Sequence, residues 1–218
     1  MLEYFDRGKL DALSEYAVNH STKTADYLHL LERETWQKAI QPRMLSGREQ
    51  GRMLSLFSKM IQPGRIIELG TYTGYSALCL AEGLKPDGEL ITIDINDELQ
   101  WLRNKYFQMS PYSHCIQSIH GEALNVLKTI NLDADIVFID ADKSNYLNYY
   151  RMFRSQMRRG SWIIADNVLW SGKVIDLNAN DDDTMAIREF NDYVLNDNGV
   201  ITFMWPIRDG MTIIQITE

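Results

Sequence analysis

Short apolar segments alternate with helical segments through the middle of the chain, and this alternation limits the possible folds more than any other feature. Five apolar segments are expected to be strands, at residues 66–69, 89–94, 116–120, 134–140 and 161–166. The stretches after them have the apolar spacing that indicates helices, at residues 75–84, 97–108, 122–129, 145–157 and 184–195. Strands that are apolar along nearly their whole length are typical of a parallel sheet covered on both faces. The sequence therefore predicts an α/β fold.

The last part of the chain departs from this pattern. Residues 200–205 and 212–217 are two apolar segments joined through Arg208-Asp209-Gly210. Asp-Gly between such segments is a strong signal for a β-hairpin. Because a hairpin pairs its strands in opposite directions, we expect a mostly parallel sheet whose last strand is antiparallel.

The first part of the chain is expected to be helical. Pro42 ends this helical pattern, and Ser46 followed by Glu49 has the spacing of a capping box at the start of the next helix. A length of 218 residues is within the range of one large domain. We expect one domain over residues 1–218, with residues 1–45 as an N-terminal helical extension.

Composition disfavours several classes of protein. The formal net charge is −8 and the isoelectric point is near 5.0, so nucleic acid and anionic membranes are disfavoured partners. The two cysteines, Cys79 and Cys115, have neither the spacing of a zinc site nor that of a disulfide scaffold. No apolar run has the length needed to span a bilayer, and the first residues carry no signal segment. We expect a cytoplasmic protein.

A glycine-containing turn after the first strand is the expected cofactor site. Gly70 and Gly74 flank the turn, where the absent side chains let the backbone approach a ligand closely. Asp94 ends the next strand, where an acid meets ribose hydroxyls in nucleotide-binding folds. Tyr72 replaces the middle glycine of the dinucleotide motif, and Glu68 suits a cationic ligand better than a diphosphate. S-adenosylmethionine (SAM), with its ammonium, sulfonium and ribose diol, fits these residues; the alternative is a turn that only closes a strand–helix corner.

Acids and an amide at the ends of two later strands form the expected metal site. Asp140 ends the fourth strand, and Asp166 and Asn167 end the fifth. Neighbouring parallel strands would deliver these oxygen ligands to one point, and oxygen ligands suit a hard dication such as magnesium or calcium. The alternative is helix capping, which Asp142 could perform but which does not easily explain the other three residues together. The four histidines are scattered, which argues against zinc.

Three motifs carry a further signal. They are ELGTYTGYS at residues 68–76, DADKSNY at residues 140–146 and DNVLW at residues 166–170. Their order and spacing resemble those of the metal-dependent O-methyltransferases, the group of the catechol and caffeoyl-CoA O-methyltransferases. The resemblance covers roughly residues 40–218, and the leading helices look like those of bacterial members. It implies SAM as the cofactor, a divalent metal, and a Rossmann-like doubly wound sheet of seven strands with the last antiparallel.

The resemblance implies a role in cofactor binding for ten residues. The methionine end of SAM would be lined by Met44 and Ser46. Its amino-acid part would be surrounded by Glu68, Gly70, Thr71, Tyr72 and Ser76. Asp94 would hold the ribose hydroxyls, Ala123 would lie beside the adenine, and Asp142 would also contact the cofactor.

The resemblance also implies how the reaction is arranged. Asp140, Asp166 and Asn167 would bind the metal, which could be magnesium, manganese or calcium. Lys143 would be the general base. The acceptor would be a small hydroxylated aromatic of the catechol or caffeoyl type. Relatives form homodimers, so a homodimer is expected here.

The residues after the third motif leave the substrate open. Trp170 is either an aromatic wall of the substrate site or a core residue. Ser171 follows it at a position where the plant enzymes have an asparagine that contacts the substrate. The plant tyrosines that recognise the acyl substrate fall near Asp183 and Ile187 of this chain. Residues 170–183 are rich in Gly, Asn and Asp and are expected to form a loop over the site.

Three other functions stay open at this point. Some relatives methylate a hydroxylated base of transfer RNA, although the net charge of −8 counts against this substrate. The chain could be a cofactor-binding module without activity, although all the acids and Lys143 are present. A nucleotide-linked dehydrogenase is disfavoured by the missing middle glycine.

Overall fold

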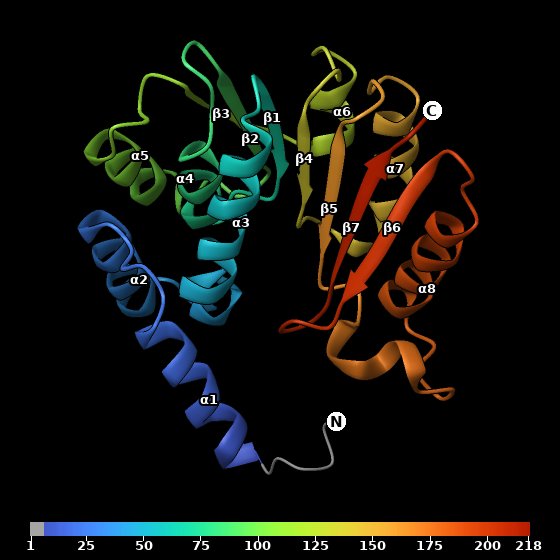
Figure 1. Cartoon of the computed structure of the whole chain (residues 1–218), viewed down its shortest axis with the longest axis horizontal. Helices are drawn as coiled ribbons and strands as arrows, with labels where there is room; N and C mark the ends of the chain where they lie inside the picture. Colours follow the sequence, from blue (N-terminus) through green and yellow to red (C-terminus); the bar gives the residue numbers. More distant parts are fainter. Residues whose placement is uncertain (1–6) are drawn as a thin grey trace.

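The central sheet has the strand order β3-β2-β1-β4-β5-β7-β6 (Figure 1) within residues 7–218, the part of the chain that the computed structural model describes. The seven strands are β1 Arg65–Leu69, β2 Glu89–Asp94, β3 Ile116–His120, β4 Ile136–Ile139, β5 Trp162–Asp166, β6 Val200–Trp205 and β7 Met211–Ile216. Strands β1 to β5 are parallel, and β7 is antiparallel to its neighbours β5 and β6. The predicted Rossmann-like doubly wound sheet, mostly parallel with the last strand antiparallel, is confirmed.

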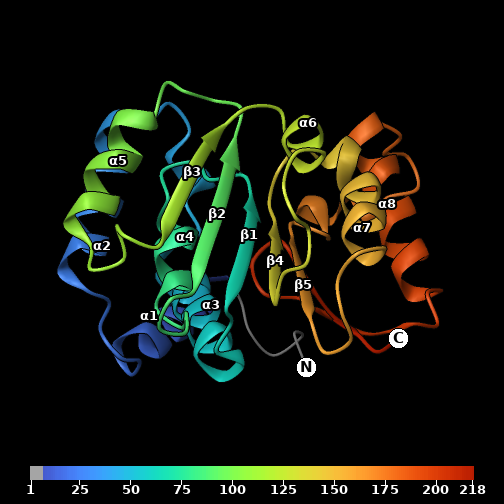
Figure 2. The same ribbon diagram turned by 90° about the horizontal axis from the view of Figure 1, so that it is seen from above.

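Helices cover both faces of this sheet. Those described are α1 Arg7–Asn19, α2 Asp26–Lys38, α3 Gly47–Ile61, α4 Tyr75–Ala81, α5 Gln100–Met109, α6 Ala123–Leu127, α7 Tyr146–Arg154 and α8 Asp182–Leu195. Helices α3 to α5 lie on one face and α6 to α8 on the other (Figures 1 and 2), and α2 packs against α4 and α5. The predicted N-terminal extension contains α1 and α2; residues 1–6 lie outside the described residues. Among the described helices, none has both the length and the hydropathy needed to cross a membrane.

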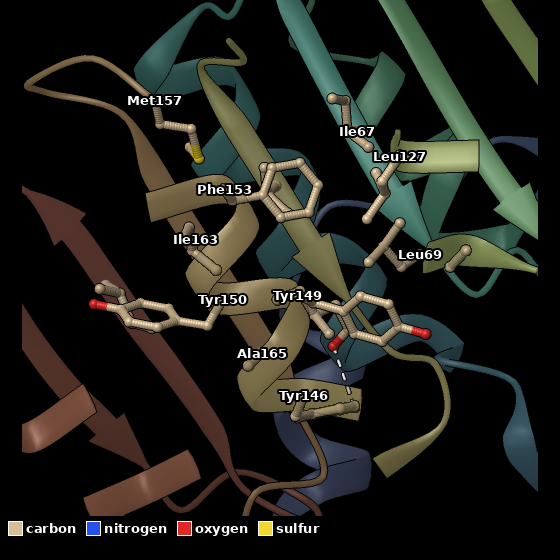
Figure 3. Packing of buried hydrophobic residues seen from close by; sticks show 14 of the residues in the cluster. Ile67, Leu69, Leu127, Tyr146, Tyr149, Tyr150, Phe153, Met157, Ile163 and Ala165 are labelled. Carbon is tan, nitrogen blue, oxygen red and sulfur yellow. Dashed lines mark hydrogen bonds between the residues drawn. The ribbon is translucent and has the colours of Figure 1, made fainter. Parts of the chain in front are cut away.

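Side chains of the central strands alternate between two apolar clusters, one on each face of the sheet. In β1, Ile66 packs in the cluster under α2 to α5, and Ile67 packs in the cluster under α6 to α8. On this second face, Tyr149 and Phe153 of α7 pack in the same cluster as Ile67 and Leu69 (Figure 3). Burying a large apolar side chain contributes roughly 1.5–3 kcal/mol. The two clusters therefore hold the strands, and with them the strand ends that carry the predicted site.

The start of α3 differs from the sequence prediction. Ser46 lies two residues after the 3₁₀ turn Pro42–Met44; it has helical backbone angles (φ −57°, ψ −37°), and its side chain makes no capping hydrogen bond. A capping residue needs an extended backbone to turn its side chain onto the first free N–H groups. Glu49 accepts a hydrogen bond from Ser14 Oγ at 2.6 Å instead. The predicted capping box is therefore wrong.

Gly70 brings the ends of β1 and β4 together. Its φ is +93°, and a Cβ at this position would lie 2.0 Å from the carbonyl oxygen of Asp140. Only glycine permits both this backbone conformation and this approach. The residue therefore places the turn after β1 directly against the first residue of the predicted metal site.

Gly70→Ala is expected to destabilise the fold much more than Gly160→Ala. Gly160 has a similar φ of +90°, but a Cβ there would have no atom within 4 Å. Gly160→Ala should cost about 1 kcal/mol for the left-handed backbone. Gly70→Ala should cost about 3 kcal/mol more, because its Cβ overlaps backbone atoms. Urea unfolding measures both free energies, and equal losses would contradict the close approach of the two strand ends.

Candidate active site

The predicted site residues lie at the carboxyl ends of the parallel strands, along one edge of the sheet. Residues 68–76 lead from β1 into α4, and Asp94 ends β2. Ala123 begins α6 after β3, Asp140 follows β4, and Asp166 ends β5. Ligands of open α/β sheets bind at this edge, where the strand order reverses, and here the order reverses between β1 and β4.

Asp94 fixes the shape of the turn after β1. The backbone N–H of Tyr72 donates to Asp94 Oδ2 at 2.6 Å, and the N–H of Asn96 donates to Oδ1 at 2.7 Å. Buried Arg103 lies 3.4 Å from Oδ2 and donates to the carbonyl of Tyr72 at 3.1 Å. Tyr72 has a left-handed φ of 50°, so these bonds hold a conformation that is costly for tyrosine. One lone pair of Oδ1 stays available for a hydroxyl donor.

Glu68 is completely buried beneath this turn. Thr92 Oγ1 donates to Glu68 Oε2 at 2.5 Å, while Oε1 has no hydrogen-bond partner among the described residues. Burial raises the pKa of Glu68 from 4.5 to about 8, against the opposing effects of the side chains of Ser76 and Thr92. Buried polar atoms in native proteins usually have a partner, and an ammonium group would supply one here. The unpartnered oxygen therefore fits the amino-acid end of SAM.

Lys143 joins the ends of β4 and β5. Its Nζ donates to Asp140 Oδ1 at 3.2 Å, to Asn167 Oδ1 at 2.9 Å and to the hydroxyl of Tyr146 at 2.6 Å. Two of the predicted ligand oxygens therefore converge on one cationic nitrogen. Burial raises the pKa of Asp140 above its ordinary value; Lys143 opposes this shift and Asp166 adds to it.

Asp166 is the third predicted ligand, and it is buried. Its Oδ1 accepts from the backbone N–H of Asn167 at 2.8 Å, and its Oδ2 accepts from Gln50 Nε2 at 2.6 Å. Asn167 has a left-handed φ of 58°, and its side chain reaches Lys143. Among residues 7–218, no group of three His, Cys, Asp or Glu side chains could hold a metal ion by itself. The predicted set has only two carboxylates, and its third member is the amide of Asn167.

Three other predicted cofactor residues lie in the segment before α3 and in the turn after β4. Met44 is 58% exposed and Ser46 is buried, both in the segment before α3. Asp142 is exposed, and its carboxylate accepts hydrogen bonds from the side chains of Tyr149 and Asn145. It makes no capping bond to the backbone of the following turn, so the alternative reading of Asp142 as a helix cap is wrong.

Trp170 and Ser171 begin the segment after β5. Trp170 is half-buried and packs against the cluster under α6 to α8, with Lys143 Nζ 5.8 Å from the centre of its ring. Trp170 therefore borders the core cluster, and its role as a wall of the substrate site stays a prediction. Ser171 is exposed, and its backbone N–H donates to the carboxylate of Asp209 in the β6–β7 turn.

The predicted loop over the site is held by α8. It begins as the 3₁₀ helix Trp170–Ile175. Arg188 of α8 donates to four backbone carbonyls within residues 173–179. The loop ends at Asp181, which caps α8 by accepting from the N–H of Thr184 at 3.2 Å. Arg188 therefore joins this loop to α8 through its backbone carbonyls.

Sequence reasoning misses four residues that contact the site. They are Gln50, Tyr146, Arg208 and Asp209. Tyr146 has a detectable signal, since it follows Lys143 by one helical turn and such pairs face each other. The others have none, because Gln50 lies in an ordinary amphipathic helix and the other two appear only as a hairpin turn.

A mostly parallel sheet with a glycine turn after β1, an acid ending β2 and oxygen-bearing side chains after β4 and β5 is the arrangement expected of a Rossmann-like methyltransferase. Comparisons with known proteins give the family. The family model described as O-methyltransferase matches residues 18–216. Caffeoyl-CoA O-methyltransferase of Medicago sativa is 32% identical, covering 93% of this chain and 87% of that protein. Probable caffeoyl-CoA O-methyltransferase 2 of Dictyostelium discoideum is 31% identical, covering 94% and 91%.

Solved structures agree with this assignment. The SAH-bound methyltransferase PaMTH1 of Podospora anserina superposes with a TM-score of 0.89 at 26% identity, covering 98% of this chain and 97% of that chain. The O-methyltransferase TomG of Streptomyces achromogenes, in complex with SAM, gives 0.88 at 25% identity, covering 95% and 96%. The chain belongs to the O-methyltransferase family and is a SAM-dependent O-methyltransferase.

Glu68→Gln is expected to flatten the dependence of stability on pH in the cofactor-free protein. The folded state keeps a proton on Glu68 up to a pKa of about 8, whereas the ordinary value is 4.5. Between these values the folded state binds more protons than the unfolded chain. The free energy of unfolding therefore falls as pH rises, by up to roughly 1.4 kcal/mol per pH unit for one proton. Glutamine does not titrate, so the variant should lack this slope.

Urea unfolding at several pH values measures this slope, and the Glu122→Gln variant serves as the control because Glu122 is exposed. A variant of Glu68 that keeps the wild-type slope would show that Glu68 does not carry the proton.

Proposed function

We propose that this enzyme transfers the methyl group of SAM to one of two adjacent hydroxyls of a small aromatic acceptor of the catechol or caffeoyl type. We propose further that Asp140, Asp166 and Asn167 bind a divalent cation that chelates these hydroxyls. The observation that carries the proposal is the convergence of Asp140 Oδ1 and Asn167 Oδ1 on Lys143 Nζ, at 3.2 and 2.9 Å. The acceptor type is supported by relatives that are named caffeoyl-CoA O-methyltransferases.

The chemistry of the donor set fits a hard dication. All three side chains offer oxygen, which magnesium, manganese and calcium prefer. Asp140 and Asp166 repel each other, which contributes to the raised pKa of Asp140, and a bound dication would relieve that repulsion. When bound, the cation would lower the pKa of a chelated hydroxyl and direct its oxygen toward the methyl group.

Lys143 would act as the general base in its neutral form, which a nearby dication would favour, and would then receive the proton of the acceptor hydroxyl at Nζ. In the transfer, the acceptor oxygen forms a bond to the methyl carbon, and the bond from that carbon to the sulfonium sulfur breaks. Its electron pair stays on sulfur, which gives S-adenosylhomocysteine (SAH). Tyr146 and Asn167 hold Nζ at 2.6 and 2.9 Å, so the base stays aligned while its proton changes. A positioned base contributes typically about 10²–10⁴-fold.

The remaining predicted residues would bind the cofactor and border the acceptor. The unpartnered Oε1 of Glu68 would accept from the ammonium of SAM, and Asp94 Oδ1 would accept from its ribose. Trp170 would form one wall of the acceptor site, with Ser171 at its rim. The other cofactor contacts stay predictions, for Met44, Ser46, Gly70, Thr71, Tyr72, Ser76, Ala123 and Asp142.

A chelator experiment tests the proposed function. Methyl transfer from labelled SAM is measured for catechol, caffeate, caffeoyl-CoA and transfer RNA, with and without chelator. We expect methylation of a catechol or caffeoyl compound that the chelator abolishes. Transfer to RNA alone would contradict the acceptor class, and transfer that the chelator leaves unchanged would contradict the cation. Tight binding of SAM with no transfer to any acceptor would favour the inactive binding module.

Two substitutions separate the cation from the base. Asp166→Ala is expected to bring turnover close to background while the affinity for SAH stays near that of the wild type, because Asp166 is assigned to the cation alone. Lys143→Met is expected to lower turnover by about 10²–10⁴-fold while a cation still binds. Initial rates and calorimetry with SAH measure these effects. Asp176→Ala, an exposed acid of the neighbouring loop, should keep the wild-type rate; a wild-type rate in Asp166→Ala would contradict the proposed role of the cation.

The homodimer and the cytoplasmic location also stay predictions. Light scattering after size-exclusion chromatography measures the first. A mass of one chain across the working concentration range would contradict the homodimer.

A further inference from the structure

Gln50 is a buried amide between a carboxylate of the site and an arginine of the β6–β7 turn. Its Nε2 donates to Asp166 Oδ2 at 2.6 Å, and its Oε1 accepts from Arg208 Nη1 at 2.8 Å. The Gln50 residue is 2% exposed, and Asp166 is 5% exposed. The three side chains therefore form a continuous chain of hydrogen bonds that leads from the turn, through α3, to the end of β5.

Arg208 determines which way the amide of Gln50 points. A guanidinium has only donors, so only the amide oxygen can face it. The amide nitrogen must then face Asp166, whose carboxylate oxygens accept. A reversed amide would break both hydrogen bonds and leave buried polar atoms unpaired, which is costly.

Gln50 and the backbone together fix the carboxylate of Asp166. Its Oδ1 accepts from the N–H of Asn167 at 2.8 Å, and its Oδ2 accepts from Gln50. Each oxygen keeps a further lone pair, and the plane of the carboxylate is set. Hydrogen-bond partners behind a metal ligand commonly orient it and tune its affinity.

Arg208 is held in place at its own end. It has a left-handed φ of 51°, in a turn that the N–H of Gly210 closes by donating to the carbonyl of Ile207 at 2.9 Å. Its Nη2 also donates to the carbonyl of Leu45 at 3.1 Å. The guanidinium therefore has a fixed orientation, and it can set the orientation of the Gln50 amide.

We propose that Gln50 and Arg208 are positioning residues for the cation site and that they act in series, with Arg208 orienting Gln50 and Gln50 orienting Asp166. The proposal rests on the proposed function, because it concerns the cation assigned there to Asp166. If the two residues only tied α3 and the turn to the sheet, their effects on cation affinity would be small or independent of each other. A series arrangement makes them interdependent.

A double-mutant cycle on Mn²⁺ binding tests this arrangement. The affinity for Mn²⁺ is measured by electron paramagnetic resonance on the full-length protein with SAH present, for the wild type, Gln50→Leu, Arg208→Met and the double variant. Gln50→Leu should weaken binding about 10–100-fold. Arg208→Met should weaken it less, by at least about threefold. The double variant should match Gln50→Leu within about twofold, because Arg208 has nothing left to orient.

Two further variants separate positioning from stability. Ser58→Ala removes another buried side-chain hydrogen bond of α3, from Ser58 Oγ to the carbonyl of Leu80 at 2.6 Å. It should lower the melting temperature without changing the affinity for Mn²⁺. Gln50→Asn keeps an amide, but its side chain is one methylene shorter and cannot reach both partners. It should therefore weaken Mn²⁺ binding about as much as Gln50→Leu does. This variant provides the test if Gln50→Leu fails to fold.

The outcomes distinguish this inference from the proposed function. Variants of Gln50 that bind Mn²⁺ like the wild type, or a double variant whose loss equals the product of the single losses, would overturn the series arrangement alone. A wild-type protein that binds no Mn²⁺ would overturn the proposed cation site, and the series arrangement with it.

Discussion

Two acidic side chains, Asp140 and Asp166, lie at the ends of adjacent buried strands, and the site is arranged around the need to balance their charge. Burial raises the pKa of Asp140, and Asp166 adds to that shift, because a carboxylate away from water is costly unless it is paired. Lys143 supplies a positive charge to Asp140 at 3.2 Å. Arg208 supplies another, which lowers the pKa of Asp140, and it bonds to the amide of Gln50 that donates to Asp166. The proposed dication would complete this balance and would favour the neutral form of Lys143, in which this lysine could take the substrate proton.

The residues predicted to bind the cofactor also include a buried acid, Glu68. Its charge is avoided by protonation, because its raised pKa of about 8 keeps the carboxyl group protonated at neutral pH until a cationic group binds. The two halves are not electrically independent, since the charge of Asp140 contributes to the shift at Glu68. They also touch, because Gly70 lies against the carbonyl of Asp140. One edge of the sheet would therefore place a cationic methyl donor and an oxygen acceptor within reach of each other, as methyl transfer needs.

The strands and the strand-end acids could be predicted from the sequence because both follow from burial and topology. β2, β3 and β6 begin and end at the predicted residues, although β3 and β6 are the edge strands of the sheet and contain no fully buried residue. Helix starts are less predictable: Glu49 bonds to Ser14, 35 positions away, instead of Ser46. Gln50 and Arg208 could not be predicted, because the contacts Gln50–Asp166 and Gln50–Arg208 join residues 116 and 158 positions apart. Nothing in the local sequence marks contacts of that range.

The binding of a divalent cation by the ends of β4 and β5 is the central claim, and anomalous diffraction from crystals grown with SAH and Mn²⁺ tests it most directly. The account predicts one strong manganese peak whose protein ligands are side-chain oxygens of Asp140, Asp166 and Asn167, with Lys143 still bonded to Tyr146. A map without a manganese peak at these residues, with Lys143 still bridging Asp140 and Asn167 beside bound SAH, would contradict it.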